Sequence, residues 1–270
     1  MIDLHLHTTY SDGSRTPEEL VLVTKDFQAI AITDHDTTEG VVPALSIVKK
    51  QRLSLKVIPG IELSSVLGDS EVHILGYGID PASPELLRKT KSLKQERIER
   101  IRQTVDKLTT IGFPLSYQEL PITGLPGRSH VARLMVKKGY VKSVDEAFRM
   151  YLNPQKPGYV PRNKLSPKDA VSLIHQAKGV AVLAHPGLLT IELTDSLLQE
   201  IPVDGIEVFH SAHTPKDTLR FEEFAKTNDL LITGGSDCHG PKGKDRELLG
   251  LVDLPEKYLY ELLEFMDVIA

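Results

Sequence analysis

Histidines and carboxylates recur in this chain where short apolar runs end. In residues 3–7, His5 and His7 alternate with Leu4 and Leu6. Alternate residues of a strand share one face, so the two imidazoles would project together. Two imidazoles on one face suit Zn, Mn or Fe. The His-x-His pattern is common by itself, so a metal role and a structural role both stay open for this pair.

Acidic residues follow in two places. Asp12 precedes Gly13 in a loop, where its carboxylate could bind a cation, form the turn or cap the next helix. Asp34, His35 and Asp36 stand together directly after an apolar run. Three ionisable residues there are costly unless they bind something, and His35 is the best ligand candidate. Asp34 could be a ligand or orient a liganding histidine, and Asp36 could cap the next helix.

Glu62 and His73 belong to the next two apolar runs. A glutamate at the end of an apolar strand loses hydration, and bridging two cations would explain its position. His73 lies inside its apolar run, where it could be a metal ligand or a hydrogen-bonded histidine of the core.

The C-terminal third of the chain repeats the pattern. His185 ends one apolar run, and Glu207 and His210 belong to another. Asp237 and His239 follow a further run and would share one face of a strand. The carboxyl ends of barrel strands form the rim where barrel enzymes assemble their sites. A histidine or carboxylate at the end of so many apolar runs is poorly explained by chance, so the sequence predicts a multinuclear metal site at such a rim.

The apolar runs that must position these side chains have the length and composition of short strands. Helical patterns separate several of them, and three open on a capping residue followed by proline and an early acidic residue, at Thr16, Ser166 and Thr214. Strands alternating with helices predict a parallel α/β sheet, closed into a barrel or, as the alternative, open. The expected strands are residues 2–7, 29–33, 55–63, 71–77, 180–184, 205–209 and 230–234.

Residues 80–169 interrupt this alternation, because no strong strand pattern occurs in them. Helices are expected at residues 85–108, 129–138 and 144–152, and a proline-rich loop leads back to the sheet. We therefore expect a helical insertion or cap subdomain at 80–169. The barrel is then expected to comprise residues 1–79 and 170–270.

Composition excludes several classes of protein. The 270 residues carry 32 Lys and Arg against 37 Asp and Glu, and the net charge of −5 argues against stable binding of duplex DNA or an anionic membrane. No run approaches about 18 apolar residues, so no membrane-spanning helix is expected. No signal peptide is visible, and the single cysteine, Cys238, fits the reducing cytoplasm. Cys238 is expected to pack as a small residue, with a ligand role as the alternative.

The charge is unevenly divided along the chain. Residues 80–169 hold 18 Lys and Arg against nine Asp and Glu, a net +9, which leaves −14 for the rest. An acidic barrel could gather cations while a basic insertion faces an anionic substrate. The alternative is that the charges of the long helix mostly point to water. The basic residues concerned are Lys89, Lys91, Lys94, Arg97, Arg100 and Arg102.

These motifs resemble the PHP (polymerase and histidinol phosphatase) superfamily of metal-dependent phosphoesterases. The resemblance rests on residues 3–7 with 11–13, and on residues 33–35, 184–186 and 236–239. It implies a distorted (β/α)7 TIM-like barrel and a site of two to three divalent ions, Mn first, with Zn or Fe as alternatives. By that resemblance, one ion lies among His5, His7, Glu62 and Asp237, a second is bridged by Glu62 and held by His73 and His185, and a third is held by Asp12, His35 and His239.

Within the insertion, residues 128–133, 147–148 and 158–161 resemble one PHP subgroup, the bacterial nucleotide phosphatases and 5′-to-3′ exonucleases of short RNA. The resemblance implies a phosphoric ester hydrolase acting on a nucleoside 3′,5′-bisphosphate, an AMP-type nucleotide or short RNA. A histidinol-phosphate phosphatase and a catalytically silent nucleotide-binding module are the alternatives. The oligomeric state stays open.

Hydrolysis by such a site needs an activated water and neutralised phosphoryl oxygens. We expect a hydroxide bridging the metals near Glu62 to attack phosphorus in line. Arg128 is the best phosphate clamp, with an ion pair at the helix start as the alternative. His130 and His210 could contact substrate, donate a proton or be structural. Arg162, with Lys164, would add positive potential, and Tyr159 could stack on a base or pack in the core.

Overall fold

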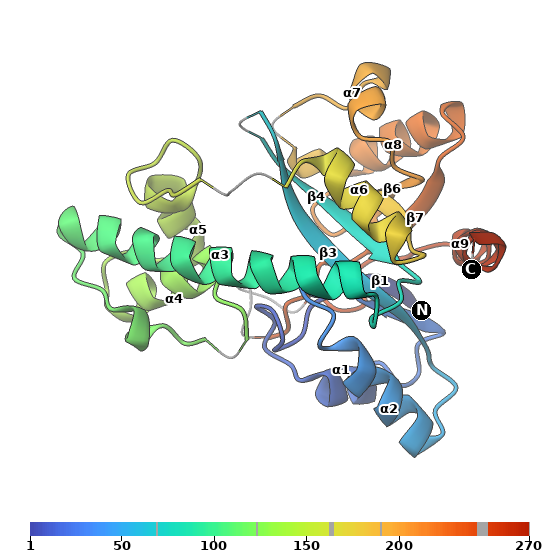
Figure 1. Cartoon of the computed structure of the whole chain (residues 1–270), viewed down its shortest axis with the longest axis horizontal. Coiled ribbons are helices and arrows are strands. Elements are labelled where there is room, and N and C mark those ends of the chain that lie inside the picture. The colour runs from blue at the N-terminus through green and yellow to red at the C-terminus, as the bar shows by residue number, and fades with distance from the viewer. Residues whose placement is uncertain (69, 123, 162–164, 190, 242–247, 270) are drawn as a thin grey trace.

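Seven strands of the described chain form one sheet in the order β1-β2-β3-β4-β5-β6-β7 (Figure 1). The computed structural model describes residues 1–68, 70–122, 124–161, 165–189, 191–241 and 248–269. Arg162 and Lys164 therefore lie outside the described residues. The strands are β1 (Ile2–Leu6), β2 (Ala29–Ile32), β3 (Lys56–Leu67), β4 (Ser70–Tyr77), β5 (Val180–Leu183), β6 (Gly205–His210) and β7 (Leu231–Gly235).

The first and last strands approach each other and nearly close the sheet. The backbone N–H of His7 donates to the carbonyl of Cys238 at 3.1 Å, and the N–H of Ser236 donates to Asp3 Oδ1 at 2.8 Å. A Cβ at Gly235 would collide with the backbone of His5, so only glycine permits this approach. The predicted α/β barrel with seven strands is confirmed.

The prediction of a wholly parallel sheet is wrong at β4, which pairs antiparallel with both β3 and β5. Only two residues separate Leu67 from Ser70, too few for the crossover that a parallel connection needs. Gly68 reverses the chain with a φ of 59°. Because β4 runs backwards, His73 near its start lies at the same rim as the carboxyl ends of the parallel strands.

Helices cover the outside of the barrel (Figure 1). Thr16, Ser166 and Thr214 each accept the N–H three residues ahead, and proline follows each, so the predicted helix starts are confirmed. The helices that accompany the strands are α1 (Pro17–Val23), α2 (Val41–Gln51), α6 (Pro167–Gln176), the short turn η3 (Pro186–Leu188), α7 (Asp195–Glu200), α8 (Pro215–Thr227) and α9 (Glu256–Ile269).

The segment between β4 and α6 is helical, as predicted. Its elements are α3 (Pro84–Thr110), η1 (Tyr117–Glu119), α4 (Arg128–Lys137), α5 (Val144–Ala147) and the π turn η2 (Phe148–Leu152). In Figure 1, α3 runs from the barrel out to α4 and α5. Ile101, Val131 and Leu152 belong to a hydrophobic cluster separate from those of the barrel. This separate cluster supports a cap, whose boundaries at residues 80 and 169 stay a prediction.

The alternative, in which the charges of the long helix mostly point to water, does not hold for two of the basic residues of α3. Arg97 is 5% exposed and Arg100 is 7% exposed, whereas Lys91 and Arg102 are exposed. The buried pair faces the barrel, where Asp36 and Glu71 supply carboxylates. A buried guanidinium needs such a partner, which periodicity alone does not reveal.

Among the described residues, no helix combines the length and the apolar character needed to cross a membrane.

Candidate metal centre

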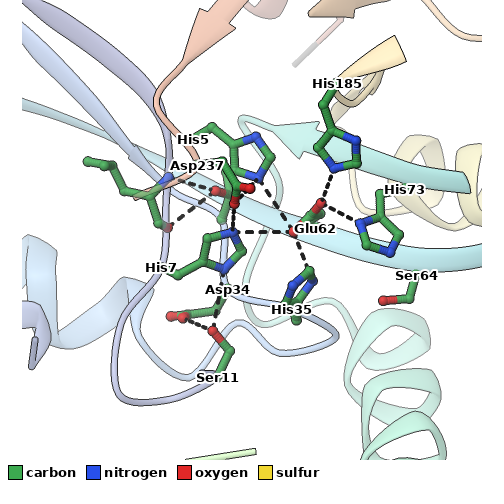
Figure 2. A network of polar contacts seen from close by, with 12 residues as sticks. His5, His7, Ser11, Asp34, His35, Glu62, Ser64, His73, His185 and Asp237 are labelled. Atoms are coloured by element: carbon green, nitrogen blue, oxygen red, sulfur yellow. Dashed lines mark hydrogen bonds and ion pairs between the residues drawn. The ribbon is translucent and has the colours of Figure 1, made fainter. Parts of the chain in front are cut away.

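Glu62 on β3 lies at the middle of the histidine cluster and is 1% exposed (Figure 2). Its Oε2 faces His35 Nδ1 at 2.8 Å, His7 Nε2 at 3.3 Å and His5 Nε2 at 3.4 Å. Its other oxygen, Oε1, faces His73 Nδ1 at 2.8 Å and His185 Nε2 at 3.1 Å. Burial acts to raise the pKa of Glu62, but the surrounding histidines outweigh burial and hold that pKa well below its usual value. The two oxygens of one ionised carboxylate therefore face two separate sets of imidazoles.

Asp237 and His239, directly after β7, bring the end of the chain to the same rim. Asp237 Oδ1 lies 3.1 Å from His7 Nε2. His239 Nε2 lies 3.1 Å from Asp12 Oδ1, which is also 4.0 Å from His35 Nε2. Burial would raise the pKa of Asp12, yet His239 and the other nearby histidines keep it well below its usual value. His35 thus stands between Glu62 and Asp12.

Three residues at this rim have left-handed backbone conformations, which residues other than glycine rarely adopt. The φ angle is 53° at Asp36, 29° at His185 and 54° at Asp237. Such conformations cost about 1–3 kcal/mol each and concentrate at functional sites. Each of the three lies two to four residues after the end of a strand, in the turns that carry the histidine cluster.

Two buried carboxylates support the cluster from outside. Glu207 on β6 contacts His5 Nδ1 through Oε1 at 3.0 Å and accepts the N–H of His185 through Oε2 at 2.8 Å. Asp34 accepts the N–H and hydroxyl of Thr8 at 2.7 and 2.6 Å and the hydroxyl of Ser11 at 2.5 Å. Both oxygens of Asp34 are thus used by the loop that precedes Asp12, and Ser11 of that loop lies 3.5 Å from His7 Nδ1, so the predicted orienting role of Asp34 would act through Ser11.

Several buried atoms that face the middle of the cluster lie close to one another but make no hydrogen bond of suitable geometry within the described part of the chain. They are Nε2 of His5 and His7, Oδ1 of Asp12 and Oε2 of Glu62. Buried polar atoms are almost always hydrogen-bonded, and imidazole nitrogens with carboxylate oxygens are the donors that Mn, Fe and Zn accept. The residues therefore fit divalent cations. The described residues contain four groups of potential ligand atoms: His7, Asp12, His35 and His239; His5, His7 and Asp237; His5, Glu207 and His210; and His35, Glu62 and His73.

The two histidines predicted to contact substrate lie at the centre or beside it. His210 Nδ1 accepts the N–H of Ala212 at 3.2 Å, and its Nε2 lies 3.9 Å from Asp237 Oδ2. His130 Nδ1 accepts the N–H of Gly127 at 3.0 Å. Burial lowers the pKa of both histidines to about 4. A neutral ring whose Nδ1 accepts a hydrogen bond carries its proton on Nε2, so both rings have an N–H available as donor.

Arg128 makes an ion pair, which was the predicted alternative to a phosphate clamp, and its partner lies on β4. Its Nη2 contacts Glu71 Oε2 at 2.5 Å, and its Nη1 donates to the carbonyl of Leu152 at 3.2 Å. The rings of Phe148 and Tyr159 each lie 5.7 Å from its guanidinium carbon. These contacts fix the guanidinium beside the rim, and its role as a phosphate clamp stays a prediction. Arg162 falls outside the described residues.

Residues 3–175 match the family described as PHP domain. The chain belongs to the PHP domain family. The matched segment ends before His185, Asp237 and His239, and the barrel returns these three residues to the cluster. There they face residues of the matched segment, as His185 faces Glu62 and Asp237 faces His7.

Relatives of this PHP protein are similar over nearly their whole length. It is 36% identical over 267 residues to a 3′,5′-nucleoside bisphosphate phosphatase of Chromobacterium violaceum, with 94% of this chain and 92% of the relative covered. It is 35% identical over 251 residues to the 5′-3′ exoribonuclease Rnm of Escherichia coli, with 88% and 85% covered. A solved structure described as a candidate metal-dependent phosphoesterase from Bifidobacterium adolescentis superposes with a TM-score of 0.86 at 30% identity, covering 97% of this chain and 95% of that one.

Some supporting residues of this PHP site were missed by the sequence reasoning. His213 accepts the N–H of Gly187 through Nε2 at 3.1 Å, and its Nδ1 contacts the carbonyl of Val208 at 2.8 Å. It thereby holds the turn that follows His185. Nothing in its sequence context signals this role, because both partners are backbone groups brought near by the fold. Glu207 was noted only as part of the recurring pattern, and its bonds to two histidine residues could not be read from the chain.

Glu207→Gln is expected to weaken metal binding by about 10–100-fold, the usual effect of removing a carboxylate that orients a histidine ligand. The amide keeps the size of the side chain but cannot accept from both the His5 ring and the His185 backbone. Titration of Mn²⁺ into the metal-free protein, followed by isothermal calorimetry, measures the change. Affinity equal to that of the parent protein would contradict the orienting role.

A second orienting contact joins the insertion to the barrel. Ser129 on α4 donates its hydroxyl to Asp12 Oδ2 at 3.1 Å, and Arg133 donates to the Asp12 carbonyl at 3.3 Å. Ser129→Ala is expected to reduce the affinity for one bound ion about 10-fold or more, because Asp12 then loses its fixed orientation. Metal content per chain, measured by plasma mass spectrometry after dialysis, should fall by up to one ion. Ser92→Ala, an exposed position on α3, is the control and should retain the full content.

Proposed function

We propose that the protein is a metal-dependent hydrolase of nucleotide phosphate esters. Its substrates would be a nucleoside 3′,5′-bisphosphate or an AMP-type nucleotide, and short RNA attacked from its 5′ end. The observation that carries this proposal is the placement of Glu62, whose two oxygens face two sets of histidines. The phosphatase of C. violaceum and the exoribonuclease of E. coli, each about one-third identical, support the choice of substrates.

The proposed cofactor is two to three divalent ions, Mn first, with Zn or Fe as alternatives. Bound ions of this kind lower the pKa of water and neutralise phosphoryl oxygens. The proposed sets follow the expected division, with Glu62 shared between the first two. His5, His7 and Asp237 would complete the first set, His73 and His185 the second, and Asp12, His35 and His239 would form the third.

The chain's own residues would then act on the substrate directly. His210 would present the N–H of its neutral ring to the leaving oxygen and stabilise the charge on it by a hydrogen bond, whereas its predicted part as a proton donor would need the protonated ring. Arg128 would hold a phosphate oxygen through the fork of its guanidinium. His130 presents a second N–H from the insertion. Arg162 would add positive potential for the anionic substrate, as predicted from the sequence.

Residues 80–169 would form a cap that supplies the positive charge opposite the acidic barrel. The net charges of +9 and −14 favour this division of labour, in which cations gather in the barrel and the anion meets the cap. The partner is a small phosphorylated molecule. A cytoplasmic location fits the single cysteine.

The test is hydrolysis by the purified protein with Mn²⁺, offered adenosine 3′,5′-bisphosphate, AMP, a short 5′-phosphorylated RNA and histidinol phosphate. We expect the highest kcat/KM on one of the nucleotide substrates. A clear preference for histidinol phosphate would replace the proposal with that alternative. Saturable binding of nucleotides with no hydrolysis under Mn²⁺, Zn²⁺ or Fe²⁺ would identify a silent binding module.

A further inference from the structure

The seam between β1 and β7, where the barrel closes, lies directly beside the metal centre. Within the described residues β1 pairs with β2 and β7 pairs with β6, and the seam itself has one isolated bridge, of Leu6 with Cys238. The register of β1 against β2 also shifts between Asp3 and Leu6. Where no continuous ladder joins two strands, their backbone N–H groups need other acceptors, because buried N–H groups are almost always hydrogen-bonded.

The side chain of Asp3 supplies such an acceptor at the seam. Asp3 is 0% exposed. Its Oδ1 accepts the N–H of Ser236, the residue after β7, at 2.8 Å, and the N–H of His5 at 3.4 Å. Its Oδ2 is buried as well but makes no hydrogen bond of suitable geometry within the described part of the chain. One carboxylate oxygen therefore connects the backbone of β1 to the backbone that leaves β7.

Ser236 is the first residue of the turn that carries two candidate ligands, Asp237 and His239. The φ angle of Asp237 is 54°, and a residue other than glycine keeps such a conformation only where its surroundings hold it. After Asp237, the carbonyl of His239 accepts the N–H of Ser14 at 2.8 Å. Before Asp237, the N–H of Ser236 is held by Asp3. The unfavourable conformation thus lies between two fixed points, one of which is the carboxylate of Asp3.

The position of this turn decides whether Asp237 can bind an ion together with the histidines of β1. Figure 2 shows Asp237 beside them, and its Oδ1 lies 3.1 Å from His7 Nε2 and 3.6 Å from His5 Nε2. A metal site tolerates changes of only about 0.2 Å in its bond lengths. A small displacement of the turn would therefore remove Asp237 from an ion held by His5 and His7.

We infer that Asp3 is a positioning residue of the metal centre. Through Oδ1 it holds the backbone of His5 and the turn of Asp237 and His239 in the arrangement that binds cations. It acts through these residues and is itself no ligand. The inference rests on the proposed function only because that function uses the bound ions. His73 and His185, which belong to the proposed second set, lie on other parts of the barrel and should not depend on Asp3.

The test measures bound Mn²⁺ per chain, by plasma mass spectrometry after dialysis, in Asp3→Ala and Asp3→Asn. Asp3→Ala removes the acceptor, so the content should fall by one or two ions, because the first and third sets include Asp237 and His239. At least one ion should remain. The asparagine variant keeps an acceptor oxygen and should retain the content of the parent protein. On the best nucleotide substrate, kcat/KM should fall about tenfold or more in the alanine variant and stay close to the parent value in the asparagine variant.

Hydrogen exchange in the metal-free protein measures the proposed bond directly. The amide of Ser236 should lose its protection in Asp3→Ala and keep it in Asp3→Asn. Asp204→Ala is the matched control. Asp204 also uses a carboxylate oxygen to accept a backbone N–H, that of Ala181 at 2.7 Å, but at the opposite ends of the strands, just before β6. This variant should change neither the metal content nor the exchange at Ser236.

Full metal content in Asp3→Ala would overturn the inference. Equal losses of metal in the alanine and asparagine variants would overturn it as well, because the acceptor oxygen would then not be the feature that matters. Asp3→Val lacks the acceptor but suits a strand, and it serves if the alanine variant does not fold. Neither metal content nor exchange involves a substrate. A protein that hydrolyses no nucleotide would therefore contradict the proposed function, whereas selective loss of ions in Asp3→Ala would still support the positioning role.

Discussion

Replacing Glu62 with glutamine is expected to abolish hydrolysis and to release bound metal at the same time. Glu62 is 1% exposed, and its two oxygens together face five histidines. An amide has one acceptor oxygen and one N–H₂ group, so it cannot serve both sets of ligands. Loss of an orienting carboxylate already weakens metal sites about 10–100-fold, and loss of a shared ligand should exceed that range.

Two measurements on the same preparation test this expectation. The value of kcat/KM on the best nucleotide substrate should fall by more than about 100-fold, and metal content per chain should fall by at least one ion. Glutamine has nearly the volume of glutamate, so the barrel should remain folded, as circular dichroism can verify. Glu39→Gln is the matched control, because Glu39 is an exposed carboxylate near the same rim. Full activity with unchanged metal content in Glu62→Gln would show that the centre lies elsewhere.

Much of this centre could be predicted because its residues obey local rules. His5 and His7 are two apart on one strand and therefore share a face. His35, Asp237 and His239 directly follow strands, and the carboxyl ends of parallel strands meet at one rim. Alternation and strand ends are properties of short segments, so a single sequence contains them.

The path of β3 and β4 was harder to predict. The apolar run ends at residue 63, and the expected strand stopped there. In the structure β3 continues to Leu67, because its backbone pairs with β4 over eight positions. Ladder hydrogen bonds and packing between neighbouring strands override weak strand propensity. The antiparallel direction of β4 follows from this pairing, and that direction places His73 at the rim.

The supporting contacts could not be predicted, since they join distant parts of the chain. Ser129 reaches Asp12 across 117 positions, and Glu207 reaches His5 across 202. A serine at a helix start and a glutamate inside a strand have many ordinary roles, so their residue types alone do not reveal these partners. Only the fold shows that each fixes a residue of the centre.

The ion pair of Arg97 could not be predicted from the sequence for the same reason. On α3 it belongs to a run of basic residues that reads as a solvated helix face. Asp36, its partner, reads as a helix cap. The two side chains meet across 61 positions in a contact of 2.7 Å, with Arg97 5% exposed. Burial acts to lower the pKa of Arg97, but Asp36, Asp12 and Glu62 outweigh burial and raise it. The pair therefore stays ionised while it joins the insertion to the barrel.

Breaking this pair should be strongly destabilising. Arg97→Met removes the guanidinium that pairs with Asp36, and removing one partner of a buried ion pair costs about 3–5 kcal/mol. Urea denaturation of the metal-free protein measures the free energy of unfolding, and metal removal prevents ion binding from masking the loss.

Arg102→Met is the matched control on α3, because Arg102 is exposed and its substitution should change that free energy by less than about 0.5 kcal/mol. In a double-mutant cycle with Asp36→Asn, the second substitution should destabilise the Arg97→Met protein less than it destabilises the parent. A loss below about 1 kcal/mol for Arg97→Met would place the pair with solvent-screened surface ion pairs and contradict its role in holding the insertion.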